Sequence, residues 1–271
     1  MKTTLLKWSF DQVLYTHFLY LYKFIFSGGP NAVPLLFFML LLAFGSCSPS
    51  YYAPGPQCPP GFVRKGQSKM SAAYTHSFSA TGYEACFAHT PLPHLTVSAN
   101  HITYSGEKNT DPNAYFVHGY LNELGVGYYT WLDPGRQFVF DLSFHFGYGN
   151  VAYRASGQKY AYQNYYVESK FRRKSLLAGL TYLSRHLEAA FSVKLSQLSY
   201  VDTRFSYFSP KDYTSPLLDA HYKYLVEPSL VVRAGPSNLK LFAGVEMAHK
   251  IHTDALRVAN KRISLGLHVR F

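Results

Sequence analysis

The feature of the sequence that most constrains the fold is a strict alternation of residue types near the middle of the chain. From Phe138 to Tyr148 every second residue is large and apolar, and after Val139 the residues between them are small or polar. Successive side chains of a β-strand point to opposite faces, so this pattern predicts a strand with one wholly apolar face. A strand of this length can cross the apolar band of an outer membrane, which is about 25 Å tall.

The same alternation ends the chain. In 261–271, Ile263, Leu265 and Leu267 fall on an apolar face, and Arg262 and Ser264 fall on a polar one. Alternation with period two predicts ten strands in all, at about 69–79, 82–90, 95–104, 115–129, 138–149, 170–184, 187–203, 222–234, 239–249 and 261–271. An even number of two-faced strands is typical of an outer-membrane barrel.

The connections between these strands are expected to be of two kinds. Short turns join strands two and three, four and five, six and seven, and eight and nine. Asp133-Pro134-Gly135 gives the strongest turn signal among them. Long polar loops are expected at 105–113, 154–168, 204–221 and 250–260. Short turns on one side and long loops on the other side favour an antiparallel up-and-down transmembrane β-barrel over 69–271, with both barrel ends on the periplasmic side.

The composition of the 271 residues agrees with a barrel. Charged residues make up 15% and aromatic residues 17%, whereas a globular protein carries about 25% charged residues. A bundle of membrane helices would need several apolar runs of about 20 residues. The formal net charge is +11, and the basic residues are scattered along the chain and form no long run. We therefore expect membrane lipid and lipopolysaccharide as partners, and no nucleic acid.

Residues 1–46 have the features of a lipoprotein signal peptide. An apolar stretch from Ala32 to Ala43 has signal-peptide length, and the unusually long lead before it suggests that translation starts downstream of Met1. Gly45-Ser46-Cys47 then resembles a lipobox, which predicts cleavage and lipidation at Cys47. The alternative is an uncleaved membrane anchor helix. Residues 47–68 are rich in proline, glycine and serine, and are expected to form an extended tether.

If Cys47 carries lipid, two cysteines remain in the exported chain. Cys86 falls on the inward face of its predicted strand, so a disulfide between Cys58 and Cys86 would tie the tether to the barrel interior. The alternative is two buried free thiols. The sequence contains no Cys-x-x-Cys motif or Cys/His cluster, and we expect no metal site and no cofactor.

A lipobox, a short tether and an alternating barrel together resemble the uncharacterised outer-membrane β-barrel lipoproteins of Bacteroidetes-type bacteria. The resemblance rests on Gly45-Ser46-Cys47, Leu124–Tyr129, Gly147-Tyr148-Gly149 and the ending Arg270-Phe271. It implies a location and a fold, but no activity. Ser48-Pro49-Ser50 lacks the acidic run associated with surface export in such bacteria, which implies a lipid anchor on the periplasmic side of the outer membrane.

The polar face of the predicted strands carries nearly balanced charges. Because unpaired charges are costly in a narrow lumen, pairing is expected. The predicted lumen charge network comprises Glu84, Glu123, Asp141, Glu188, Lys194, Glu227, Arg233, Lys240, Glu246, Arg262, His268 and Arg270. We interpret it as a salt-bridged plug in a barrel of structural or binding role. A path for protons or solutes and a small-molecule site at the mouth of the lumen are the alternatives.

Two further functions remain open from the sequence. A soluble lipocalin-like or β-sandwich lipoprotein could bind a small ligand, and an omptin-like hydrolase could use polar residues of the long loops. The candidates for the latter are Asp111, Asp202, Asp212, Asp219, His221, His252 and Asp254. No Gly-x-Ser-x-Gly motif is present, and we expect no enzymatic activity. Arg172-Arg173-Lys174 is expected at the outer rim, where it would meet lipopolysaccharide phosphates.

Overall fold

A computed structural model describes most of the chain beyond residue 54. The described residues are 55, 57, 61–62, 64–77, 80–110, 113–157, 165–207, 222–251 and 261–271. The predicted signal peptide, the predicted lipidation site Cys47 and the predicted disulfide partner Cys58 lie outside them. Within the described ranges, no helix has both the length and the apolar character needed to cross a membrane.

All regular structure in the described part of the chain is β-strand. The strands are β1 (Ser68–Ser77), β2 (Thr81–Leu92), β3 (Leu95–Thr110), β4 (Asn113–Trp131), β5 (Phe138–Gly157), β6 (Tyr165–Leu183), β7 (Leu187–Tyr207), β8 (Lys223–Ala234), β9 (Leu239–Met247), β10 (His249–Ile251) and β11 (Lys261–Arg270). β9 and β10 pair with β8 in one continuous register, as Ser229↔Glu246 and Val226↔His249 show. They therefore form a single strand of the barrel, interrupted at Ala248.

The strands form one closed antiparallel barrel. Each strand pairs with its neighbours in the sequence, and the ring closes where β1 pairs with β11 from Lys69↔Arg270 to Ser77↔Arg262. With β9 and β10 counted as one strand, the described residues form ten strands, which confirms the predicted architecture. A single closed sheet also shows that the β-sandwich alternative is wrong.

The two faces of the strands lie as the alternation predicts. On β5, Leu142, Phe144 and Phe146 are exposed on the outside of the barrel, while Asp141 and His145 are buried inside. The same holds on β11, where Leu265 and Leu267 are exposed and Ser264 is buried. We call the outward apolar zone of all ten strands the apolar belt.

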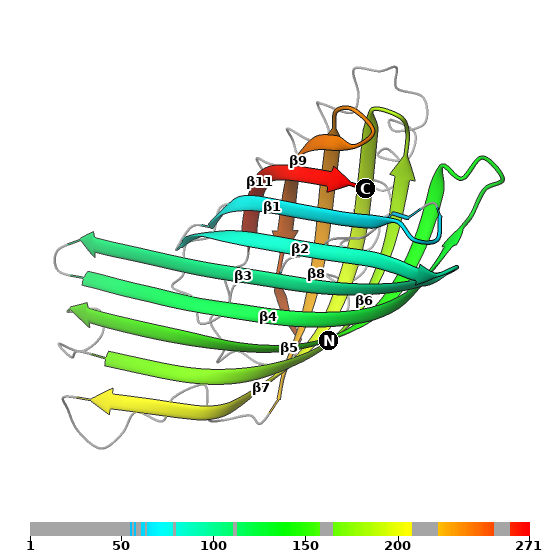
Figure 1. The fold of residues 1–271 in the computed structure, drawn as a ribbon. Helices are drawn as coiled ribbons and strands as arrows, with labels where there is room; N and C mark the ends of the chain where they lie inside the picture. The colour runs from blue at the N-terminus through cyan, green and yellow to red at the C-terminus, as the bar shows by residue number, and fades with distance from the viewer. Residues whose placement is uncertain are drawn as a thin grey trace, which may run out of the picture. The chain divides into compact units, whose positions relative to one another are not determined.

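Five strands are longer than predicted and extend beyond the apolar belt. Figure 1 shows β3 to β7 reaching past β1 and β2 at one end of the barrel. The prediction of a long loop at 105–113 is wrong, because β3 and β4 stay paired up to Thr110↔Asn113. The predicted loop at 154–168 is likewise too long, since β5 and β6 pair as far as Ala155↔Tyr165.

These errors arise because the alternation continues beyond the belt with its two faces exchanged, so that apolar residues point inward and polar residues point outward. On β5 beyond the belt, Val151 and Tyr153 point inward and are buried, while Arg154 points outward and is exposed. Polar residues on the outside and apolar residues on the inside are the pattern of a water-soluble β-protein. We call the end with these extensions the long-loop end, and the end with the turns at 93–94, 132–137, 184–186 and 235–238 the short-turn end.

Candidate functional site in the barrel lumen

The short-turn half of the lumen is filled by ion pairs. Glu188 on β7 is fully buried and is surrounded by four cations from four other strands. Its carboxylate lies 3.0 Å from Nζ of Lys240, 3.4 Å from Nη1 of Arg233 and 3.8 Å from Nζ of Lys69, and it also contacts Arg270. Lys69 was not among the predicted network residues. One carboxylate thus joins five consecutive strands of the ring, from β7 through β8, β9 and β11 to β1.

A second cluster lies higher in the lumen, around Arg173 of β6. Nη2 of Arg173 donates to both carboxylate oxygens of Glu227, at 3.1 and 3.0 Å, and its Nε lies 3.3 Å from Glu123. Lys194 donates to Glu123 at 3.4 Å. The expectation that Arg173 lies at the outer rim is therefore wrong. It points into the lumen and is fully buried, because only alternate residues of a strand face outward.

A third cluster joins strands near the closure of the barrel. Arg262 on β11 pairs with Glu84 on β2 at 2.7 Å and also contacts Glu246 on β9. All three side chains are buried. Strong pairing of this kind is required, because a buried carboxylate without a cation costs several kcal/mol in an interior of low dielectric constant.

The remaining predicted network residues also face the lumen. Asp141 and His268 are buried, and their side chains have no hydrogen-bond partner among the described residues. Asp141 packs against Gly179, where a Cβ would lie 2.5 Å from its carboxylate. His145, also buried, shares a 2.8 Å hydrogen bond with the hydroxyl of Ser143.

Gln57, a described residue of the predicted tether, lies in the lumen, and the sequence did not predict its contacts there. The backbone N–H of Gln57 donates to Glu246 at 3.0 Å, and its side-chain amide donates to the carbonyl of Glu227 at 2.7 Å. Its side-chain oxygen accepts a 2.9 Å hydrogen bond from Ser192. Gln57 is 2% exposed, so the tether residue is surrounded by the same strands that carry the ion pairs.

Two other tether residues lie at the short-turn end. The carbonyl of Gly61 accepts a 2.9 Å hydrogen bond from Lys69. Phe62 is fully buried and packs against Tyr129, with ring centroids 6.0 Å apart.

Cys86 faces the lumen and is disulfide-bonded. Its partner lies outside the described residues, so Cys58 remains the prediction.

The long-loop half of the lumen has a different lining, which we call the apolar cup. It lies inside the extensions of β3 to β7 and the facing parts of β8 and β9. Its buried side chains pack together in one cluster, formed by Ile102, Tyr104, Val117, Leu121, Val151, Tyr153, Val167, Phe171, Leu198, Leu225 and Ala248. The alternation of residues 150–154 and 166–172 carries a signal for this cup, provided that the strands are extended beyond the belt.

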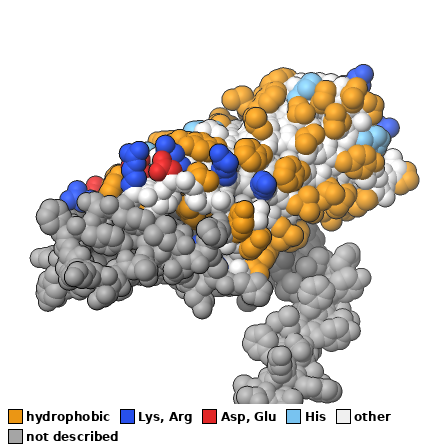
Figure 2. Space-filling view, turned by 90° about the horizontal axis from the view of Figure 1, so that it is seen from below, with side chains coloured by type: hydrophobic (Ala, Val, Ile, Leu, Met, Phe, Trp, Pro, Cys, Tyr) orange, Lys and Arg blue, Asp and Glu red, His pale blue; other side chains and the backbone are white. Residues whose placement is uncertain are grey.

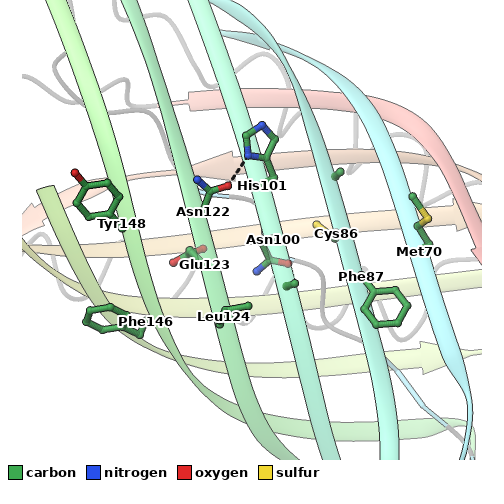
Figure 3. Close-up of a pocket in the computed structure, with 12 residues that line it drawn as sticks. Met70, Cys86, Phe87, Asn100, His101, Asn122, Glu123, Leu124, Phe146 and Tyr148 are labelled. Atoms are coloured by element: carbon green, nitrogen blue, oxygen red, sulfur yellow. Dashed lines mark hydrogen bonds between the residues drawn. The ribbon is translucent and has the colours of Figure 1, made fainter. Parts of the chain in front are cut away.

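The outer wall carries a groove of about 480 Å³ within the apolar belt. Figure 3 shows Met70, Phe87 and Leu124 around it, and the hydrogen bond between His101 and Asn122, of 2.7 Å, at its edge. Small outward residues of β2 and β3 leave this space between larger neighbours. The groove is open to the outside and is apolar, as expected of a surface in contact with acyl chains.

Basic side chains lie directly above the belt on β6. Arg172 and Lys174 point outward and are exposed, and Lys170 forms a 3.2 Å ion pair with Asp202 of β7. Figure 2 shows Lys and Arg side chains gathered beside the hydrophobic area on this face of the barrel. Arg172 and Lys174 therefore remain candidates for contact with anionic headgroups, whereas Arg173 does not.

The structure describes one of the seven loop residues considered for a hydrolytic site. Of the loop residues considered, Asp202 is described and pairs with Lys170 on the outer wall. Asp111, Asp212, Asp219, His221, His252 and Asp254 lie outside the described residues. Across the described ranges, no three His, Cys, Asp or Glu side chains come together in a group that could hold a metal ion.

The chain matches no protein-family model and no curated protein sequence. Solved structures with a similar fold include the N-terminal β-barrel domain of Pseudomonas aeruginosa OprF, with 8% identity, a TM-score of 0.35, and 76% of this chain and 98% of that chain covered. The KdgM porin is similar with 11% identity and a TM-score of 0.37, over 75% and 99% of the two chains. A major outer membrane protein from Thermus thermophilus has 10% identity and a TM-score of 0.37, over 76% and 99%. The fold of this chain is therefore assigned from its own strand pairing and not from these similarities.

Proposed function

We propose that this chain is a lipid-anchored outer-membrane β-barrel with a sealed lumen and a structural or binding role, and that it has no enzymatic activity. The observation that carries the proposal is the filling of the lumen. Glu188, Lys194, Arg173 and Glu227 are fully buried although they face the inside of the barrel, and Gln57 of the tether is 2% exposed beside them. A pore of useful width would leave such groups in contact with water.

The outward face supports insertion into a membrane. Large apolar side chains are exposed on every strand of the ring, among them Tyr83, Leu124, Phe144, Leu241 and Leu265. Isolated exposed apolar residues are ordinary in soluble proteins, but a continuous band around a barrel is the pattern of a lipid contact. A soluble lipocalin-like protein would present a polar outer face, so this alternative is not favoured.

The turns and loops at the two ends of the barrel suggest its orientation in the membrane, and the basic residues beside the belt suggest a partner. In outer-membrane barrels, short turns face the periplasm and longer loops face outward. This places Arg172 and Lys174 at the outer edge of the belt, where phosphate groups of lipopolysaccharide are the matching anions. Acylation of Cys47 and the predicted tether boundaries at 47–68 belong to the proposal as well.

Electrical recording tests the sealed lumen. Full-length protein is inserted into a planar lipid bilayer after unheated gel migration has shown that the barrel is folded. We expect no stable ion current from the full-length chain. A variant that lacks residues 48–62 provides the comparison, and we expect it to give small current steps, because Gln57 and Phe62 no longer fill the lumen. Steady conductance of the folded full-length protein would contradict the proposal.

A further inference from the structure

The groove on the outer wall forms where two neighbouring strands carry small outward side chains. Ala99 on β3 pairs with Phe87 of β2 and Leu124 of β4, and its short side chain leaves a gap between them (Figure 3). Ala85, the next outward residue of β2, widens the gap towards the long-loop end. The volume of about 480 Å³ falls within the range of about 300–1,000 Å³ that is usual for sites of small molecules. The groove is therefore large enough to hold an acyl chain as a bound group.

Polar outward side chains border the groove on its long-loop side. His101, the next residue after Ala99 on this face of β3, pairs with Asn122 of β4 and shares a 2.7 Å hydrogen bond with its side-chain oxygen. Asn122 pairs in turn with Tyr148 of β5, and Tyr148 pairs with Arg172 of β6. All four side chains are exposed on the outer wall, and we call them the polar row. Because the hydrogen bond uses the oxygen of Asn122, its amide nitrogen keeps its N–H donors for a ligand.

Two cations lie beside the groove at the spacing of neighbouring strands. Arg172 pairs with Tyr148 and Lys174 pairs with Phe146, and both aromatic residues line the groove. Neighbouring strands lie about 4.8 Å apart, so the long side chains of Arg172 and Lys174 can reach a group held above the groove. An apolar seat with positive charge at its edge is the complement of an anionic lipid.

From this arrangement we propose that the groove and the polar row bind one molecule of lipopolysaccharide. An acyl chain of its lipid A lies in the groove, and a phosphate lies at Arg172 and Lys174. The inference rests on the proposed function, because it takes the long-loop end to face the outer leaflet. It deepens that function by assigning the lipid a single site with a defined place for the chain and for the phosphate.

The extent of the polar row favours lipopolysaccharide over a phospholipid. The row crosses four neighbouring strands and therefore extends over about 14 Å. A glycerophospholipid presents one phosphate on a narrow headgroup. The disaccharide of lipid A presents phosphates, hydroxyls and acyl carbonyls side by side, so it can use His101, Asn122 and Tyr148 as well as the two cations.

A second copy of the chain is a less suitable occupant of the groove. In a two-fold dimer the same surface of both copies forms the interface. Arg172 and Lys174 lie beside the groove, so a dimer would bring the cations of both copies together, and like charges at an interface are unfavourable.

Native mass spectrometry of the folded full-length protein, stripped of lipid in detergent, tests the site. The probes are lipid A with both phosphates, the same lipid A without phosphates, and phosphatidylglycerol with chains of equal length. We expect one phosphorylated lipid A per barrel, bound about tenfold more tightly than either comparison lipid, because charge-assisted hydrogen bonds to the phosphate are lost in the one and the row is left unused in the other. Equal binding of the three lipids would overturn the inference.

Ala99→Phe tests the groove, because the larger side chain fills it. Ala243→Phe on β9 is the matched control, since Ala243 is also an outward residue of the belt and lies outside the groove. We expect Ala99→Phe to weaken binding of lipid A about tenfold through the lost contacts of the acyl chain, and Ala243→Phe to change it by less than about twofold. Unchanged binding by Ala99→Phe would contradict the proposed seat of the chain.

Arg172→Met tests the phosphate contact. Arg185→Met, exposed in the turn between β6 and β7, removes the same charge at the short-turn end and is its control. We expect Arg172→Met to weaken binding of phosphorylated lipid A about tenfold and to leave binding of the dephosphorylated lipid unchanged. Equal weakening of both lipids, or an equal effect of Arg185→Met, would show that the phosphate does not lie at Arg172.

The same spectra and two further measurements separate this inference from the proposed function. A mass of two chains that Ala99→Phe reduces to one chain would show that a second copy occupies the groove, and would overturn the lipid site. A parent protein that migrates as a heat-modifiable, sealed barrel but binds all three lipids alike refutes the lipid site alone. A parent protein that stays monomeric in plain buffer without detergent refutes the membrane barrel itself.

Discussion

The two halves of the lumen share several strands, β7 and β8 among them, and follow opposite rules. Towards the short-turn end, the inner face carries Glu188, Lys194 and Arg233 in ion pairs. Towards the long-loop end, the inner face of the same strands carries Leu198 and Leu225 in an apolar cluster. The difference follows from what surrounds the wall. Where the outside is apolar, the inside carries the ion pairs beside smaller apolar clusters such as Val231 with Phe242. Where polar side chains face outward, as Arg154 and Arg172 do, the inside becomes a core.

The largest expected effect is in the charged half. Arg173→Met leaves Glu227 buried without its bidentate partner, and it removes one of the two cations beside Glu123. Removing one partner of a buried ion pair costs about 3–5 kcal/mol. We expect a loss of that size in the free energy of unfolding, measured by urea titration of the refolded barrel.

Lys174→Met is the matched control for Arg173→Met. Lys174 is the next residue on β6 and is exposed on the outer wall, so its loss is expected to cost less than about 1 kcal/mol. In the double variant Arg173→Met, Glu227→Gln we expect part of the lost stability to return. If Arg173→Met and Lys174→Met lowered the free energy of unfolding equally, the distinction between the inner and outer faces would be wrong.

The apolar cup gives the next effect. Leu198→Ala opens a cavity in a packed cluster, and such substitutions cost about 2–5 kcal/mol. Leu195 on the same strand is exposed within the belt, where lipid can fill the space that a smaller side chain leaves. We expect Leu195→Ala to cost clearly less in the same urea titration. If Leu198→Ala were as mild as Leu195→Ala, the cup would be loosely filled rather than a core.

The boundary between the two halves lies at Gly55. A side chain there would overlap Arg173 and crowd Leu121, so Gly55→Leu should lower stability by about 1–3 kcal/mol through overpacking. Gly244→Ala is the control, since every neighbour of its Cβ position lies at 3.4 Å or beyond. Unchanged unfolding of Gly55→Leu would mean that the tether is not held between the two halves.

The smallest effect is expected outside both halves, in the turn between β4 and β5. Asp133 accepts backbone hydrogen bonds from Phe138 at 2.6 Å and Gln137 at 3.0 Å. These bonds hold the pKa of Asp133 below its ordinary value of 3.8. A lowered pKa in the folded state contributes stability above the unfolded pKa, and this contribution is lost as pH falls through the folded pKa.

Asp133→Asn should therefore lower the urea midpoint slightly at pH 7, with the difference from the parent protein narrowing below about pH 4. A difference that stays constant from pH 7 to pH 3 would show that the charge of Asp133 does not act through these bonds.

Much of the barrel could be predicted from the sequence because one physical signal, alternation, specifies both pairing and facing. The outward positions of Leu142, Phe144 and Leu265 follow from it directly, as does the inward position of Asp141. The even number of two-faced strands is consistent with the antiparallel closure of β1 on β11.

Three other features were missed, and alternation carries a signal for two of them when the two faces are considered separately. The cup was missed because the polar outward residues 166–172 resemble a loop until their inward neighbours, such as Val167 and Phe171, are considered separately. The position of Arg173 could have been found by parity, since Leu176 faces outward and Arg173 is three residues away. The path of Gln57 through the lumen could not have been found, because a single glutamine in a proline-rich segment gives no local sign of its partners.

The central claim, that the apolar faces meet lipid and the polar faces fill the lumen, is tested most directly by spin labels along β11. Cysteine substitutions at Ile263, Leu265 and Leu267, and at Ser264, are labelled in the barrel refolded into lipid vesicles. The account predicts high collision rates with dissolved oxygen and low rates with a polar nickel reagent at 263, 265 and 267, and low rates with both at 264. Low oxygen collision at the three outward positions, or high collision at Ser264, would contradict it.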